Sequence, residues 1–296
     1  MNRPELTAIV YALCGVAVLA LMDAVMKGVS LAIGAYSAAL LRVVCGTAIV
    51  APIWIATRPA WPNRRALSLH IERGFVSAFM GLTFFYALTK LPIAEAIALS
   101  FVAPLLALYL AAALLGEIVD RRSIVASVIG FAGTIVIVGG KIGREAIDSD
   151  AALGLGSLFV SALLYAYNFI VIRKQSQVAK PLEITVFHSG VSALVLGLGA
   201  PFFLQPPMPA QWAQIGTTAI LTVTGSMLIA AAYARAEAQK LVPLEYTGFL
   251  WACLFGWIWF REQVTLTTAA GALLIVAGTW IASRKPRGAQ DKAIAP

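Results

Sequence analysis

The sequence predicts an all-α integral membrane protein with ten transmembrane helices, arranged as two inverted five-helix repeats with both termini cytoplasmic. Three observations predict this fold. The 296 residues are 60% hydrophobic and only 12% charged, with a mean hydropathy of +0.86, whereas soluble domains carry about 25% charged residues. Apolar runs long enough to cross a bilayer recur along the chain. The order of features in the first half recurs in the second.

Each predicted span is an apolar run bounded by charged or turn-forming residues. The first run follows Arg3 and lacks a small-x-small cleavage site after it, which favours an uncleaved helix over a secretory signal. Pro104 lies in the middle of the fourth run and predicts a bend, because proline removes a backbone donor. The spans of the first half are predicted at 6–22, 34–55, 71–88, 93–115 and 123–140.

A charged connector at 141–152 is the longest polar interruption in the chain and marks the boundary between the halves. We therefore predict a first repeat over 1–140, a second over 153–283, and a basic cytoplasmic tail over 284–296. The spans of the second half are predicted at 153–172, 184–203, 212–233, 244–262 and 265–282.

The halves are related by a shift of 145 residues, since Glu117 ends the fourth span and Glu262 ends the ninth. Each half holds an odd number of spans, so the second copy enters the membrane in the opposite direction and the repeats are inverted. Shifts of 145 or 146 also align Asp23 with Asn168, Ser100 with Glu245, Gly133 with Gly278, and Arg42 with His188.

Charge distribution predicts the orientation. With the N-terminus in the cytoplasm, sixteen Lys and Arg residues, Arg73 among them, fall on the cytoplasmic side and five on the other, while Arg42 is intramembrane and completes the 22. Basic residues are enriched in cytoplasmic loops, so this split favours both termini inside. The net charge of +8 is thus explained by loops. No basic patch interleaved with aromatic residues indicates a nucleic-acid partner.

Enzyme and channel classes find little support in the sequence. It contains no His-Glu-x-x-His, Gly-x-Ser-x-Gly, paired intramembrane aspartates or phosphate loop. A filter-like or ring-forming segment is also missing. The two histidines are too few for a His-rich metal site, and the three cysteines fit no metal motif. We expect no enzymatic activity, metal or other cofactor.

Several motifs resemble those of the drug/metabolite transporter superfamily, and within it of the EamA family. The resemblance covers about residues 6–282. In the second copy Phe249 stands where Pro104 stands in the first, so the bend expected there is in doubt. The motifs are Asp23-Ala24-Val25-Met26-Lys27, Arg42, Tyr86-Ala87-Leu88, Ala103-Pro104-Leu105 with Gly116-Glu117, and Glu245-Tyr246-Thr247 through Leu250-Trp251-Ala252 and Gly256-Trp257 to Glu262.

This resemblance implies a central cavity formed mainly by spans one, three, four, six, eight and nine. Tyrosine and tryptophan there offer apolar faces with a polar group, which suits aromatic or amphipathic solutes and cations. The substrate-binding residues that the resemblance implies are Asp23, Tyr86, Ser100, Tyr167, Asn168, Tyr233, Glu245 and Trp251.

Four of these residues have structural alternatives. Asn168 either binds solute or joins helices. Glu245 binds an ammonium group or carries a proton, or else forms a salt bridge with Arg235 or Lys240. Asp23 binds solute at a helix end or pairs with Lys27, four residues later. Arg42, inside the second span, pairs with Asp23 or lines a polar cavity. Trp251 lines the cavity or packs between helices.

The function expected from this resemblance is secondary transport of small metabolites across the inner membrane by alternating access. Export of amino acids, aromatic ones included, is the preferred hypothesis. Uptake of vitamin- or nucleoside-like metabolites and efflux of cationic drugs are the alternatives. The expected partners are a small-molecule substrate and the lipid bilayer, and the doubled repeat removes the need for a dimer.

Overall fold

The computed structural model describes residues 3–58, 60–115, 121–142, 149–175, 177–233, 235, 241 and 244–283, and within these ranges the chain forms helices and connections without strands. Every predicted span coincides with a helix or a pair of helices. The helices are α1 (Arg3–Ile33), α2 (Ala35–Ala56), α3 (Arg64–Lys90), α4 (Ile93–Ser100), α5 (Ala103–Leu115), α6 (Arg121–Ile142), α7 (Ser149–Gln175), α8 (Pro181–Gly197), α9 (Ala200–Phe203), α10 (Pro209–Tyr233), α12 (Thr247–Phe260) and α13 (Leu266–Ser283).

The first helix is longer than the sequence analysis predicted. The predicted end at residue 22 is wrong, because α1 continues to Ile33 and stops at Gly34, whose φ of 79° suits glycine. Asp23 and Lys27 did not end the helix, since one polar side chain per turn leaves the backbone hydrogen bonds intact. Asp23 therefore lies inside a helix and not at its end.

The predicted bend at Pro104 appears as a break in the helix at residues 101–102, between α4 and α5. At the break, two backbone hydrogen bonds span three residues instead of four: the amide of Phe101 donates to the carbonyl of Ala98, and the amide of Val102 donates to the carbonyl of Leu99. The second half has an interruption at the corresponding place even though it lacks the proline, because Tyr246 forms a turn directly before α12. The rings of Phe101 and Tyr246 meet edge to face, 5.2 Å apart.

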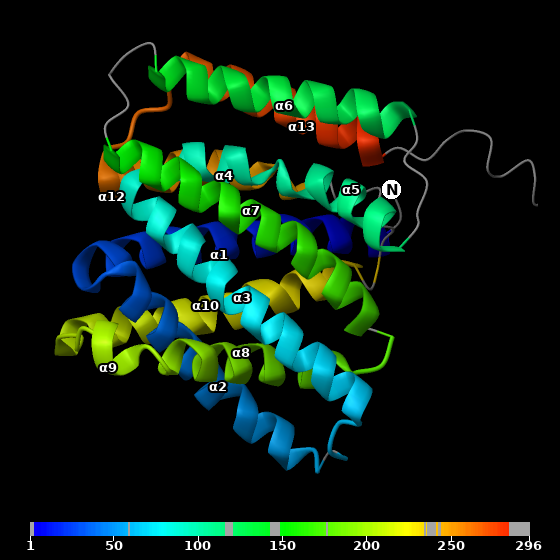
Figure 1. Ribbon diagram of the computed structural model, residues 1–296, viewed down its shortest axis with the longest axis vertical. Helices are drawn as coiled ribbons and strands as arrows, with labels where there is room; N and C mark the ends of the chain where they lie inside the picture. Colours follow the sequence, from blue (N-terminus) through cyan, green and yellow to red (C-terminus); the bar gives the residue numbers. More distant parts are fainter. Residues whose placement is uncertain are drawn as a thin grey trace, which may run out of the picture.

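The helices run alongside one another, and α1 begins at the same end of the bundle at which α13 ends (Figure 1). We call this end the terminal end and the other the distal end. α6 and α13 form one side of the bundle next to α4, while α2 lies at the opposite side.

The closest helix pairs join the two halves of the chain. α1 lies along α10, and α3 lies along α7. α12 contacts α1 as α5 contacts α7, and α2 pairs with α8 while α6 pairs with α13. The last pair is especially close: a Cβ placed on Gly133 would lie 2.6 Å from the carbonyl oxygen of Gly271.

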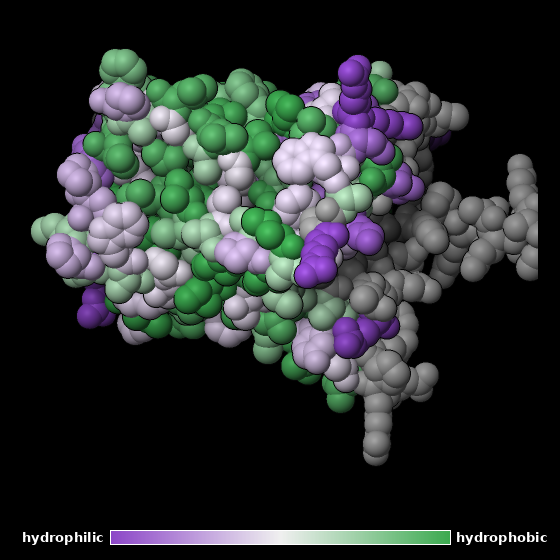
Figure 2. Space-filling model, turned by 90° about the horizontal axis from the view of Figure 1, so that it is seen from below, coloured by the Kyte–Doolittle hydropathy of each residue, from purple (hydrophilic) through white to green (hydrophobic). Residues whose placement is uncertain are grey.

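The outer surface is that of a membrane protein. A broad band of hydrophobic side chains crosses the molecule, and strongly hydrophilic ones gather at the terminal end (Figure 2). Large apolar side chains such as Leu194, Leu198 and Leu273 are more than 70% exposed. By length and composition, four helices of the described part could each cross a membrane: Leu6–Ile33, Ala35–Ala56, Ser149–Ile172 and Pro209–Ile229.

Candidate functional site

Two opposite charges lie within electrostatic range of each other where α1 and α2 pack together. Asp23 lies on α1 and Arg42 on α2, and their charges act on each other. The guanidinium of Arg42 also lies 5.3 Å from the centre of the Phe85 ring, a cation–π distance. Charged groups inside membrane helices are costly and mark functional positions. Sequence analysis had placed Arg42 within the membrane, and the structure gives it Asp23 as its opposite charge.

Tyr165 on α7 extends this charged region toward α12. The charges of both Asp23 and Glu245 act on its hydroxyl, and its side chain is 41% exposed. Glu245 is itself exposed. A tyrosine between two carboxylates, with surface left uncovered, can contact an ammonium or aromatic group. Sequence analysis selected Tyr167 and missed Tyr165, although both residues lie in the same predicted span.

Tyr167 faces away from this region because residues two apart lie on nearly opposite sides of a helix. Its hydroxyl donates to the carboxylate of Glu72 on α3. The helical period was a signal that could have separated the two tyrosines: Tyr165 shares its face with Phe169, whose ring lies 5.0 Å away.

Asn168 joins helices. Its Oδ1 accepts hydrogen bonds from Arg73 Nε at 3.2 Å and Ser77 Oγ at 3.3 Å, both from α3. Arg73 also donates to Gln175 Oε1 at 3.2 Å. Sequence analysis counted Arg73 among the loop charges, but it lies nine residues into α3, about 13 Å along the helix. It belongs to the polar interior.

The remaining predicted site residues have less direct roles. Ser100 Oγ bonds back to the carbonyl of Ala96 at 2.8 Å, in the last turn of α4. Tyr86 packs partly buried against the main hydrophobic core. Trp251 stacks on Phe255, with ring centres 6.0 Å apart, so packing is its observed contact. The side chain of Tyr233 lies outside the described residues.

Of the two alternative partners expected for Glu245, the structure describes the contacts of one, Arg235. Arg235 is engaged elsewhere, since it donates to the carbonyl of Ala231 at 2.7 Å and lies 5.1 Å from the ring of Tyr11. Lys240 lies outside the described residues, as does Glu117.

An ion pair closes the distal end. Lys27 of α1 bonds Glu262, which follows α12, and its Nζ also donates to the carbonyl of Leu91 at 2.7 Å. The second oxygen of Glu262 accepts the amide of Ile93 at 2.8 Å, so this acid caps the N-terminus of α4. Glu262 follows α12 in the chain, yet the helix that it caps is α4 of the first half. We call Lys27 and Glu262 the distal ion pair.

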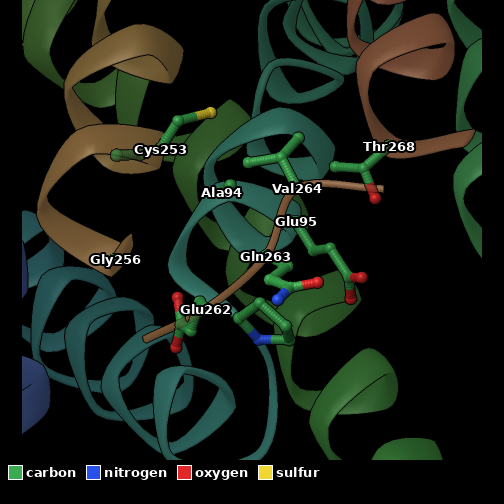
Figure 3. A pocket seen from close by; sticks show the side chains of 10 residues that line it. Ala94, Glu95, Cys253, Gly256, Glu262, Gln263, Val264 and Thr268 are labelled. Carbon is green, nitrogen blue, oxygen red and sulfur yellow. The ribbon is translucent and has the colours of Figure 1, made fainter. Parts of the chain in front are cut away.

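A small pocket lies beside the distal ion pair (Figure 3). Cys253 and Gly256 of α12 form one wall, and Glu95 of α4 lies on the other side, with Gln263 between them. Gly256 permits the close approach, because a Cβ there would lie 2.7 Å from Glu262 Oε2. The pocket is too small for a metabolite and indicates tight packing at this end.

An apolar exterior, opposed charges among α1, α2, α7 and the start of α12, and a closed distal end are the features of a membrane transport protein. The model of the EamA-like transporter family matches the chain twice, over residues 6–139 and 152–284. The chain belongs to this family, which confirms the resemblance found in the sequence.

Relatives that are named for different substrates are about equally similar to this chain in sequence. The pseudopaline exporter CntI of Pseudomonas aeruginosa is 24% identical over 270 residues, covering 90% of this chain and 92% of the relative. A riboflavin transporter of Brucella anthropi is 25% identical, covering 74% and 78%, and an S-adenosylmethionine uptake transporter of Rickettsia bellii is 24% identical, covering 76% of each. One crystal structure shares the fold, with a TM-score of 0.61 at 19% identity over 95% of this chain and 97% of the other.

Proposed function

We propose that this protein is a secondary transporter that moves small metabolites across the inner membrane by alternating access. Its preferred substrates are amino acids, aromatic ones included, and its direction is export. One observation carries the substrate assignment: the charges of Asp23 and Glu245 both act on Tyr165, and the charge of Arg42 acts on Asp23. A zwitterion with an aromatic side chain presents an ammonium for the acids, a carboxylate for the arginine and a ring for the tyrosine.

The proposed architecture is ten spans in two inverted repeats, 1–140 and 153–283. The pairing of helices supports it. If the first five spans are exchanged for the last five, the pair α1 and α10 becomes α7 and α3, and the pair α5 and α7 becomes α12 and α1. Phe101 and Tyr246, which are 145 residues apart, contact each other, as expected near a two-fold axis in the membrane plane.

A single chain then contains both arrangements that alternating access requires, so it acts as a monomer. The orientation has both termini in the cytoplasm. The basic loops support it, as does the gathering of hydrophilic side chains at the terminal end (Figure 2). In this orientation the distal ion pair closes the outward side, and the substrate site opens toward the cytoplasm. Transport uses no enzymatic step, and the driving force is a solute or ion gradient.

The relatives leave a second candidate open. The name of the pseudopaline exporter of Pseudomonas aeruginosa favours export. The names of the riboflavin and S-adenosylmethionine transporters favour a vitamin- or nucleoside-like metabolite. Both of these latter solutes carry fused aromatic rings, which suit Tyr165. Efflux of cationic drugs would use Asp23 and Glu245 alone and would leave Arg42 without a role.

Counterflow in proteoliposomes tests the proposal. Labelled phenylalanine is supplied outside, and vesicles are preloaded with one unlabelled solute each, from amino acids, riboflavin, S-adenosylmethionine and a quaternary ammonium dye. We expect transient accumulation of label with preloaded amino acids. Asp23→Asn should reduce it about tenfold or more. Asp150→Asn is the matched control, because Asp150 is 59% exposed and pairs with Lys90 at the surface.

Label that fails to accumulate with any amino acid, in protein that elutes as a folded monomer, would refute the amino-acid assignment. The same experiment repeated with labelled riboflavin, S-adenosylmethionine and dye would then decide between the alternatives. Failure of all four classes would refute secondary transport of such solutes.

A further inference from the structure

The interior of the bundle holds more positive than negative charge where α2, α3 and α8 meet. Arg42 lies on α2, Arg73 on α3 and His188 on α8, and the charges of both arginines act on the imidazole of His188. Asp23 is the acid whose charge acts on Arg42. Two guanidinium groups and an imidazole thus converge on one region. We call these three side chains the basic cluster.

The acids nearest in sequence to the basic cluster have other partners. Glu72, next to Arg73, accepts the hydroxyl of Tyr167. Glu183, five residues before His188, contacts His70 Nε2 at 2.9 Å. Both carboxylates are therefore hydrogen-bonded to other side chains and not to the basic cluster.

The hydrogen bonds to Arg73 come from neutral groups. Its Nε and Nη1 donate to the amide oxygens of Asn168 and Gln175, each at 3.2 Å. Gln175 in turn bonds His70, which stacks on Phe187 at 4.5 Å. This chain of side chains holds the guanidinium in place, and among the described residues no carboxylate is hydrogen-bonded to it. A charge held in this way attracts an anion strongly where the dielectric constant is low.

Two polar atoms of the basic cluster are left unsatisfied. Arg42 Nε and His188 Nδ1 are buried and have no hydrogen-bond partner among the described residues. Buried polar atoms are nearly always bonded, and each exception calls for an explanation such as a missing ligand. A guanidinium donates two parallel bonds to a carboxylate, which is the geometry that an unused Nε offers.

We propose that the basic cluster is the subsite for the carboxylate of the substrate, with Arg42 and His188 in contact with it and Arg73 as a positioning residue. The substrate class is therefore an amino acid or a similar amino-carboxylic acid, bound with its carboxylate at Arg42 and its ammonium toward Asp23, Tyr165 and Glu245. This inference rests on the proposed function and makes it more specific. It excludes substrates that carry only positive charge.

Equilibrium binding to the full-length protein in lipid nanodiscs tests the subsite. The probes are labelled phenylalanine and labelled phenylalaninamide, which differ only in the carboxylate. The wild-type protein should bind the acid about tenfold or more tightly than the amide. Arg42→Gln should remove this preference by weakening binding of the acid while leaving binding of the amide unchanged. Arg42→Lys should keep part of the preference for the acid, because lysine retains the positive charge but cannot donate two parallel hydrogen bonds to the carboxylate.

Two further variants separate a binding role from a structural one. His188→Gln keeps a neutral side chain that can donate a hydrogen bond, and it should reduce the preference less than Arg42→Gln does. Arg65→Gln is the matched control, since Arg65 is exposed near the start of α3. It should match the wild-type protein. Unchanged binding of the amide by the Arg42 variants shows that they remain folded.

The inference is overturned if the wild-type protein binds acid and amide alike, if it binds neither, or if Arg42→Gln keeps the preference for the acid. Counterflow of amino acids without any preference for the acid would leave the proposed function intact and remove the subsite. Preference for the acid in binding, without transport of any solute, would keep the subsite and remove the proposed function.

Discussion

Removing the lysine of the distal ion pair should open the distal end. The side chains of Lys27 and Glu262 are only 7% and 15% exposed. Lys27→Met leaves a buried carboxylate whose other bond is the amide of Ile93. Breaking a buried ion pair by removing one partner costs about 3–5 kcal/mol. The pair joins α1 to the segment after α12. In the proposed alternating access these two segments separate when the distal end opens, so the cost falls on the closed state.

A cost of about 3 kcal/mol shifts the equilibrium between closed and open states on the order of 100-fold. Cys253 reports it, because it lines the pocket beside Glu262 (Figure 3). In a protein whose only other cysteines, Cys14 and Cys45, are replaced by serine, a membrane-impermeant maleimide is added on the distal side. We expect Lys27→Met to raise the labelling rate of Cys253 by a factor approaching this shift.

Lys90→Met is the control, since it removes a lysine from an ion pair at the same end of the bundle. The pair of Lys90 and Asp150 is 25% and 59% exposed, and exposed pairs contribute about 0–1 kcal/mol. Its effect on labelling should stay within about fivefold. The double variant Lys27→Met with Glu262→Gln should label more slowly than Lys27→Met alone, because the unpaired charge is gone. Equal labelling of Lys27→Met, Lys90→Met and the wild-type protein would refute the reasoning.

Two further predictions concern packing and coupling. Gly133→Ala should lower the melting temperature, because its Cβ would lie 2.6 Å from a backbone oxygen of α13 and overpacking costs about 1–3 kcal/mol. Gly139→Ala is the control and should leave the melting temperature unchanged, because no atom lies within 4 Å of its Cβ. Equal melting temperatures of the two variants would contradict the close helix contact. Asp23→Asn and Glu245→Gln should each reduce the response of transport to an imposed pH gradient, because each variant removes a carboxylate beside Tyr165 that can carry a proton. A response retained by both variants would show that neither acid couples transport to protons.

Some polar contacts of the interior follow from sequence and others do not. The repeat shift aligned Arg42 with His188 and Asp23 with Asn168, and the structure brings the first two within electrostatic range of each other. The repeat shift did not predict that Asn168 would accept a hydrogen bond from Arg73. Arg73 was missed because it follows a basic loop, where a count of charges cannot tell a loop residue from one inside the helix.

The choice between Tyr165 and Tyr167 required the tertiary structure for a physical reason. In a soluble helix a polar face and an apolar face show which side is buried. In a membrane helix the lipid-facing and protein-facing sides are both apolar, so this signal is weak. The rotation of α7, which turns Tyr165 toward Asp23 and Tyr167 toward Glu72, is set by its packing against α3.

The sequence by itself determined the features that depend on local chemistry. Its apolar runs located the helices, Pro104 located the break between α4 and α5, and its motifs identified the family. The partner of Lys27, by contrast, depends on how the helices pack. Lys27 lies 235 residues from Glu262, and the local pattern, with an acid four residues before the lysine, suggested Asp23 as the partner. Side chains pair according to how helices cross in space, and sequence distance carries no information about that.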